Sequence, residues 1–105
     1  MKPSKYRNQP TEIDGIRFAS KKEARRYQDL KLLERAKEIE NLTLQPRYPL
    51  TVSGLHVCTY VGDFQYDEVK SGRRVTEDAK GVKTDAFRIK AKLFHALYGR
   101  EVTIV

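Results

Sequence analysis

The sequence predicts a small α/β domain in which one sheet is covered by helices. Three observations lead to this fold class. The chain has 105 residues, which fits a single compact domain. Two stretches without internal glycine or proline carry apolar residues at helical spacing, and the chain between them alternates with a period of two. The expected order is helix, three strands of a meander, helix and strand.

The N-terminal third is expected to hold a basic arm, a small hairpin and the first helix. Residues 1–10 are basic and contain two prolines, which predicts a flexible arm before a single domain of residues 11–105. Asp14-Gly15 is typical of a two-residue hairpin turn. Ser20 and Glu23 have the form of a capping box, which opens a helix to about Lys37. Apolar residues form one stripe of this helix, and Lys and Arg, Arg26 among them, form a basic face.

The rest of the chain reads as strands, a second helix and a closing strand. Residues 41–52, 55–66 and 74–80 are expected to form an antiparallel meander, with turns at residues 53–54 and 71–72. Residues 55–66 form the longest uninterrupted run, since Pro46 and Pro49 punctuate residues 41–52. Thr84 is a suitable N-cap for a helix to about Tyr98, with Gly99 as its C-cap. Residues 102–105 would add a last strand.

Charge favours a polyanionic partner. The chain has 21 Lys and Arg against 14 Asp and Glu, a net charge of +7, so nucleic acid is the leading candidate. Residues 1–37 carry +6, residues 38–78 carry −3 and residues 79–105 carry +4. Carboxylates repel phosphate, so the acidic middle segment needs another explanation. A divalent cation site and an ordinary solvated surface both remain open.

Several classes of protein are excluded. No apolar run approaches the roughly 20 residues that cross a bilayer, so no membrane partner is expected. The basic N-terminus is not followed by the apolar run of a signal peptide, which predicts a cytoplasmic protein. The single cysteine, Cys58, cannot form an internal disulfide, and with His56 and His95 it has no zinc-site spacing.

Four charged residues are candidates for chemistry. Asp63 is expected to share a strand face with Val57, Thr59 and Val61 and to end that apolar face, where a carboxylate needs a partner. A bulge at Gly62 that turns Asp63 to solvent is the alternative. Asp78 and Lys80 are two apart on the next strand and therefore point the same way. An ordinary surface ion pair explains them equally simply. Glu23 could reach the sheet from the first helix or act only as a helix cap, and both interpretations stay open.

These residues carry a family resemblance. Gly62-Asp63-Phe64 and Glu77-Asp78-Ala79-Lys80 resemble the Asp…(Asp/Glu)-x-Lys signature of restriction-endonuclease-like nucleases. Longer phrases resemble small phage and prophage proteins of formerly unknown function that are placed in the same superfamily. The early helical glutamate, Glu23, and the strand with Gln45-Pro46 resemble the endonuclease subunits of transposases. The phrases are at residues 5–8, 18–24, 44–48 and 91–94, and the resemblance covers residues 5–105.

The resemblance implies a restriction-endonuclease-like fold, with a central mixed sheet that contains an antiparallel three-strand meander flanked by helices. Two positions depart from the signature. Gly62 stands where the superfamily has proline. Glu77 lies beside Asp78, so either acid could be the ligand, although strand parity favours Asp78, which shares the face of Lys80.

The implied function is Mg²⁺- or Mn²⁺-dependent hydrolysis of DNA phosphodiester bonds by a phage-type endonuclease, acting on branched or recombining DNA. Asp63 and Asp78 would hold the metal, and Lys80 would orient or help deprotonate the attacking water. Glu23 would assist a second ion or orient Lys80. Gln45 would lie near the site. Contacts to DNA phosphates are expected from basic residues of the second helix and the loop before it: Lys83, Arg88, Lys90 and Lys92.

Two other function classes remain. One is a non-catalytic nucleic-acid-binding module on a nuclease-like scaffold, and the other is a structural protein of a phage particle. A chain of 105 residues has a small surface for gripping a duplex alone, which favours a homodimer or a phage partner protein.

Overall fold

The strands form one four-stranded sheet and two separate hairpins, with a helix packed on each side. The computed structural model describes residues 10–80 and 82–105, so the predicted basic arm lies, apart from Pro10, outside the described residues. The elements are β1 (Thr11–Ile13), β2 (Ile16–Phe18), α1 (Lys21–Arg35), β3 (Ile39–Leu44), β4 (Arg47–Val52), β5 (Leu55–Val61), β6 (Phe64–Glu68), β7 (Arg74–Asp78), α2 (Asp85–Tyr98) and β8 (Val102–Ile104).

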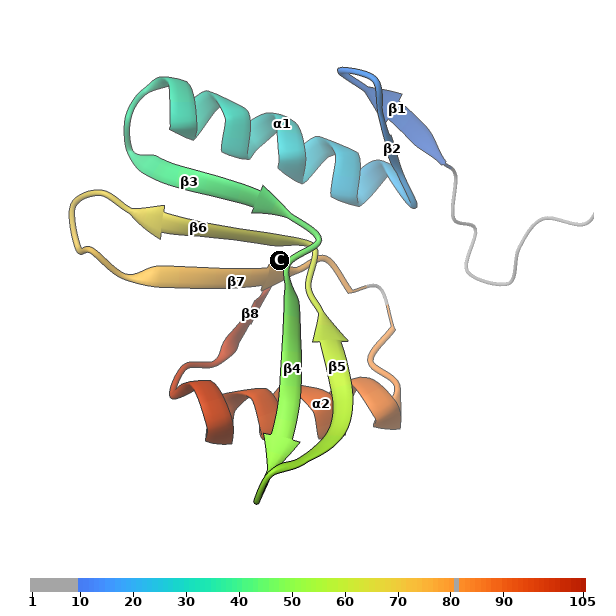
Figure 1. The fold of residues 1–105 in the computed structure, drawn as a ribbon. Coiled ribbons are helices and arrows are strands. Elements are labelled where there is room, and N and C mark those ends of the chain that lie inside the picture. Colours follow the sequence, from blue (N-terminus) through green and yellow to red (C-terminus); the bar gives the residue numbers. More distant parts are fainter. Residues whose placement is uncertain (1–9, 81) are drawn as a thin grey trace, which may run out of the picture.

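The central sheet is mixed. Its strand order is β3-β6-β7-β8; the first three strands are antiparallel and β8 runs parallel to β7. Helix α1 lies alongside β3, and the β1–β2 hairpin sits at its N-terminal end (Figure 1). The β4–β5 hairpin leaves the sheet and packs against α2. The predicted α/β class with a mixed sheet and two helices is therefore confirmed.

Local sequence signals placed the helices and turns correctly. Asp14 and Gly15 have φ angles of 54° and 76° in the β1–β2 turn. The Ser20 hydroxyl accepts a hydrogen bond from the Glu23 N–H at the start of α1. Thr84 caps α2 in the same way, and Gly99 ends it with φ of 74°. In the described part of the chain, neither helix has the length and apolar character needed to cross a membrane.

The predicted long strand over residues 55–66 is wrong. It is two strands, β5 and β6, with Gly62 and Asp63 between them, and the predicted strand over residues 41–52 is likewise divided into β3 and β4. Backbone hydrogen bonds hold the two breaks side by side: Gln45 N–H donates to Asp63 O (2.9 Å) and Gly62 N–H to Pro46 O (3.0 Å). Both strands of one long hairpin thus leave the sheet together. Strands β3, β6 and β7 are antiparallel neighbours. The connection from β3 to β6 is the whole β4–β5 hairpin and not a tight turn.

The face predicted for Asp63 is wrong for the same reason. Asp63 lies after the end of β5, and the apolar residues expected to share its face are on the exposed side of the hairpin: Val57 is 59% and Val61 40% exposed. The break turns the chain, so strand alternation does not carry over from β5 to Asp63.

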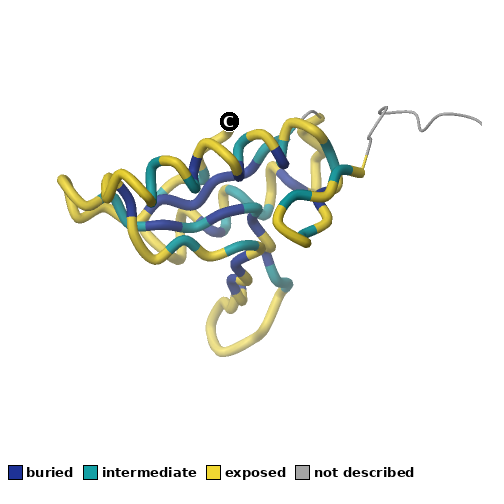
Figure 2. Tube along the Cα trace, turned by 90° about the horizontal axis from the view of Figure 1, so that it is seen from above, coloured by how far each residue is buried: buried dark blue, intermediate teal, exposed yellow. Residues whose placement is uncertain are grey.

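Two apolar cores lie on opposite sides of β7. One packs under α1 and includes Leu30, Phe64 and Val75, where the buried residues of the sheet concentrate (Figure 2). The other lies between the β4–β5 hairpin and α2 and includes Tyr48, Tyr60 and Phe94. Side chains alternate across a strand, so β7 presents Val75 and Glu77 to α1, and Thr76 and Asp78 to the hairpin. Four consecutive residues of β7 are buried, three of them polar or charged.

Candidate active site

The structure brings the four candidate residues to one end of β7. Glu23 is in the first turn of α1, Asp63 is in the β5–β6 break, Asp78 ends β7 and Lys80 follows it by two residues. Two contacts tie these segments together: Asp63 N–H donates to Glu77 O (3.0 Å), and Lys22 Nζ donates to Lys80 O (3.5 Å). Residues separated by as many as 57 positions therefore share one site, which we call the acidic cluster (Glu23, Asp63, Asp78 and Lys80).

Asp78 is the best-anchored member of the acidic cluster. It is 2% exposed; its Oδ2 accepts a hydrogen bond from Tyr60 Oη (2.6 Å), and its Oδ1 is 3.5 Å from Lys80 Nζ. Burial raises the pKa of Asp78, although the Tyr60 hydrogen bond lowers it; the charge of Asp63 and a side-chain hydrogen bond with it raise it further. Asp63 therefore lies close enough to Asp78 to act on its protonation.

Asp63 is held by the backbone of the strand that carries Asp78. Its Oδ2 accepts a hydrogen bond from the Ala79 N–H (2.6 Å). The N–H of the preceding Gly62 is used in the bond to Pro46 O, so a proline at position 62 would lose that bond. A Cβ at Gly62 would also lie 3.2 Å from Thr76 Cγ2. The local packing therefore accounts for glycine where the nuclease signature has proline.

Glu23 completes the cluster from α1. Burial, followed by the negative charges of Asp63 and Asp78, raises its pKa from 4.5 to about 7. A backbone hydrogen bond at Ala19 has the opposite effect on this pKa. The carboxylate therefore combines a contact at the helix start with proximity to both aspartates, so the cap and the site interpretations are compatible.

Lys80 is the cation of the cluster. Its side chain is 34% exposed, and its Nζ lies 4.9 Å from the centroid of the Phe87 ring, in addition to the contact with Asp78. One ammonium stands against three carboxylates. An excess of negative charge is costly in a partly buried site and favours binding of protons or cations.

Glu77 has a different role from its neighbour. It is fully buried on the α1 face, where its carboxylate accepts hydrogen bonds from Arg26 Nε (2.8 Å) and Nη2 (2.6 Å) and from the Tyr66 hydroxyl. Its oxygens are therefore occupied, which favours Asp78 as the acid that faces the site. The expectation that Arg26 belongs to an outer basic face is wrong, because the buried Glu77 draws it inward. The sequence signal for this inward position is that Arg26 follows Glu23 by three residues and so lies near it on the helix surface.

A small cavity connects the acidic cluster to Gln45. The cavity of about 130 Å³ is lined by Glu23, Asp63, Gln45 and by residues of the β1–β2 hairpin and the end of β3. Gln45 lies in the left-handed region (φ 49°) and is exposed beside Asp63. The same wall contains Arg17, a cation that sequence reasoning missed, since only the packing of the hairpin on α1 brings it there.

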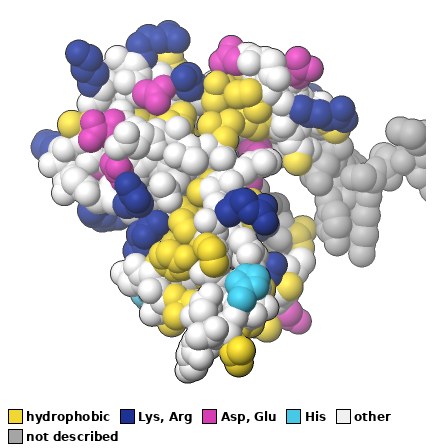
Figure 3. Space-filling view, viewed as in Figure 1, with side chains coloured by type: hydrophobic (Ala, Val, Ile, Leu, Met, Phe, Trp, Pro, Cys, Tyr) yellow, Lys and Arg dark blue, Asp and Glu magenta, His cyan; other side chains and the backbone are white. Residues whose placement is uncertain are grey.

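The basic residues predicted to contact DNA lie on α2 and in the loop before it. Lys83, Arg88 and Lys92 are exposed and line a separate pocket between α2 and β8, and Lys90 is half-buried on α2. Arg88 is within 4.0 Å of Asp85. Lys and Arg side chains also lie over the α1 half of the face seen in Figure 3, so the positive charge is not confined to α2.

The oxygen donors suit a hard divalent cation. Asp63 is bonded to the N–H of Ala79, the residue after Asp78, and carboxylate oxygens are the ligands that Mg²⁺ prefers. Within residues 10–80 and 82–105, no three His, Cys, Asp or Glu side chains converge as a ready metal-holding group. Asp63 and Asp78 are the two carboxylates that could ligate such an ion, and Glu23 would add its negative charge to the site.

The fold and the acidic cluster define a small α/β protein with a buried carboxylate, Asp78, and a half-buried one, Asp63, at a sheet end. The chain belongs to the family described as "Protein of unknown function (DUF1064)", whose model matches residues 3–105. No curated protein and no solved structure matches the chain.

Proposed function

We propose that the protein is a Mg²⁺- or Mn²⁺-dependent endonuclease of phage type that hydrolyses DNA phosphodiester bonds. The observation that carries the proposal is that hydrogen bonds to Glu77 O and from Ala79 N–H hold Asp63 beside Asp78, with Lys80 Nζ 3.5 Å from Asp78 Oδ1. This is the arrangement that the Asp…(Asp/Glu)-x-Lys signature requires of a shared metal site. The mixed sheet flanked by helices is compatible with the restriction-endonuclease-like superfamily.

The carboxylates would hold the cation. Asp63 and Asp78 supply two oxygen ligands, and Glu23 adds negative charge from α1. Tyr60 binds one oxygen of Asp78 and thereby sets the direction of the other. Mg²⁺, when bound, supplies positive charge that polarises the scissile phosphate and acidifies a nearby water.

Proton transfer and charge neutralisation would fall to the side chains. The Lys80 ammonium can donate a hydrogen bond to a phosphate oxygen, which offsets charge that develops in the transition state. Glu23, with a pKa of about 7, can accept a proton near neutral pH. The net charge of +7 favours association with DNA, with branched or recombining DNA as the proposed substrate class. Association as a homodimer or with a phage partner protein would enlarge the binding surface.

Cleavage assays test the proposal. Supercoiled, linear and branched DNA are incubated with the protein and Mg²⁺, Mn²⁺ or a chelator. We expect metal-dependent cutting that falls by at least about 100-fold in Asp78→Asn, in line with the loss of one transition-state interaction. Asp85→Asn is the matched control, since Asp85 has a 96% exposed side chain at the start of α2. Lys80→Gln and Lys70→Gln form a second pair, since Lys70 is exposed in the turn between β6 and β7.

Two outcomes would contradict the proposal: no metal-dependent cutting of any substrate, or cutting that survives Asp78→Asn. Strong salt-dependent binding without cleavage would instead support the non-catalytic nucleic-acid-binding module, which the exposed basic residues of α2 also favour.

A further inference from the structure

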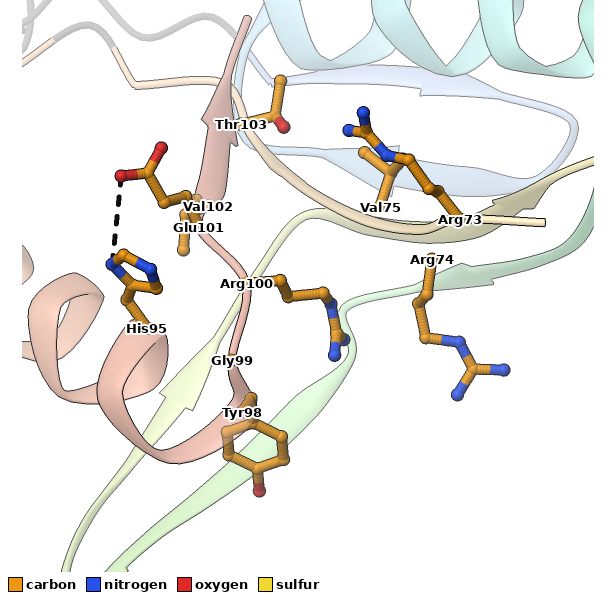
Figure 4. A pocket seen from close by; sticks show the side chains of 10 residues that line it. All are labelled: Arg73, Arg74, Val75, His95, Tyr98, Gly99, Arg100, Glu101, Val102 and Thr103. Carbon is orange, nitrogen blue, oxygen red and sulfur yellow. Dashed lines mark ion pairs between the residues drawn. The ribbon is translucent and has the colours of Figure 1, made fainter. Parts of the chain in front are cut away.

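A second cavity lies at the opposite end of β7 from the acidic cluster. It has a volume of about 680 Å³, and its walls come from the start of β7, the end of α2 and the chain leading into β8. Strand β7 separates Arg74 at this cavity from Asp78 in the cluster by four residues, about 13 Å of strand. The side chains that define its chemistry are Arg73, Arg74, His95, Tyr98, Arg100 and Glu101 (Figure 4).

Arg100 is the central feature of this cavity. Its Nη2 donates to Thr76 Oγ1 (3.2 Å), and its guanidinium lies over the rings of Phe94 (5.2 Å) and Tyr48 (5.8 Å). Its Nε is buried without a hydrogen-bond partner, and no carboxylate of the described residues is within ion-pair distance of it. The structure therefore fixes a positive charge in place and leaves it uncompensated.

Arg74 adds a second guanidinium on the same side. In Figure 4 the side chains of Arg74 and Arg100 extend to one side of β7, and Arg73 extends to the other. Arg74 binds Asp67 through Nε (2.9 Å) and Nη2 (3.3 Å), so its charge is partly offset, and its side chain remains 52% exposed. At the far wall, His95 Nδ1 is 3.8 Å from Glu101 Oε1. The unpaired charge of the cavity is thus that of Arg100.

We propose that this cavity binds a backbone phosphate of a nucleic acid, separately from the acidic cluster. A planar guanidinium recognises phosphate oxygens with paired N–H donors. The cavity is larger than one phosphate needs, and the ring of Tyr98 in its wall offers a surface for an adjoining base or sugar.

Only the choice of nucleic acid as the ligand rests on the proposed nuclease function. A strand held here would be fixed in register relative to the acidic cluster, because both lie on one rigid strand, with Thr76 between them bonded to Arg100. Positioning by a phosphate contact at a distance carries no sequence information. The cavity would therefore contribute affinity and alignment rather than base choice.

Binding measured in a chelator tests the site independently of cleavage. The probe is a fluorescent 20-nucleotide DNA, followed by anisotropy at several salt concentrations, with inorganic phosphate as competitor. We expect Arg100→Gln to weaken binding about 10-fold and to reduce the salt slope by about one phosphate contact. Arg35→Gln, which removes the same charge from the exposed end of α1, should change binding less than about 2-fold. Arg100→Lys keeps the charge without the fork and should fall between the wild type and Arg100→Gln.

The outcomes separate this proposal from the nuclease. Equal binding by wild type and Arg100→Gln, with both folded by circular dichroism, overturns the site and leaves the nuclease standing. If Arg100→Gln loses binding and the wild-type protein does not cut DNA, the phosphate site is supported and the nuclease proposal is wrong. If millimolar inorganic phosphate displaces the DNA from wild type as well as from Arg35→Gln, the cavity takes free phosphate and the assignment to backbone phosphodiesters is wrong.

Discussion

Replacing Arg26 by methionine is expected to destabilise the protein strongly without touching the acidic cluster. The Glu77 side chain is 1% exposed, and Arg26 supplies two of its hydrogen bonds at 2.6 and 2.8 Å. Removing one partner of a buried ion pair leaves an uncompensated charge, which costs about 3–5 kcal/mol. The remaining donor, the Tyr66 hydroxyl, cannot neutralise a carboxylate. A domain of this size has about 5–15 kcal/mol in total, so much of its stability would be lost.

Urea unfolding followed by circular dichroism measures this loss. The matched control is the double variant Arg26→Met/Glu77→Leu, which removes both charges and should recover most of the deficit, because two apolar side chains often replace a buried ion pair at little cost.

A loss below about 1 kcal/mol in Arg26→Met would refute the assignment of Glu77 as a structural acid that needs its arginine. A double variant no more stable than the single variant would refute the physical reason given for the loss. Either result would reopen Glu77 as a candidate for the acidic cluster in place of Asp78.

Three further predictions concern the acidic cluster. Glu23 has a raised pKa of about 7, so its contribution to stability is fully present below pH 4.5 and is lost as the pH rises through about 7. In thermal melts, Glu23→Gln should therefore be more stable than wild type at pH 8, by up to about 3 kcal/mol. At about pH 4 the two proteins should be equally stable. Mg²⁺ or Mn²⁺ at 100 times its Kd should stabilise wild type by about 2.7 kcal/mol but not Asp63→Asn or Asp78→Asn; an equal rise of Tm in all three would place the metal elsewhere. Gly62→Ala should lower the free energy of unfolding by about 1–2 kcal/mol, because its Cβ would lie 3.2 Å from Thr76 Cγ2. An unchanged urea midpoint would show that the backbone of the β5–β6 break adjusts to the methyl group without loss of stability.

Local chemistry predicted the helices and turns because their signals are contained in a few adjacent residues. Ser20 and Thr84 cap α1 and α2 where the sequence indicates, and Asp14-Gly15 and Gly99 adopt the positive φ angles expected of them. The strand divisions could not be found in this way. Residues 55–66 have strand propensity throughout, and the break at Gly62 exists because the neighbouring segment breaks at Pro46, 16 residues earlier in the chain.

The candidate site shows the same division. The spacing of Asp78 and Lys80 predicted a shared face, and Asp78 Oδ1 does lie 3.5 Å from Lys80 Nζ. The position of Asp63 was predicted near them for the wrong reason, since it depends on the break and not on alternation along a strand. The inward position of Arg26 was indicated only by its spacing of three residues from Glu23, and the cavity around Arg100 had no clear sequence signal.

By itself, the sequence determined the α/β class, the two helices with their caps, the excess of positive charge and the acidic middle segment. These properties depend on composition and on neighbours within about four residues along the chain. Tertiary structure decided which carboxylate faces which partner: Glu77 pairs with Arg26, and Asp78 meets Asp63 and Tyr60. The physical reason is that a charge can be buried only beside a compensating group, and in this fold those groups come from segments distant in the chain.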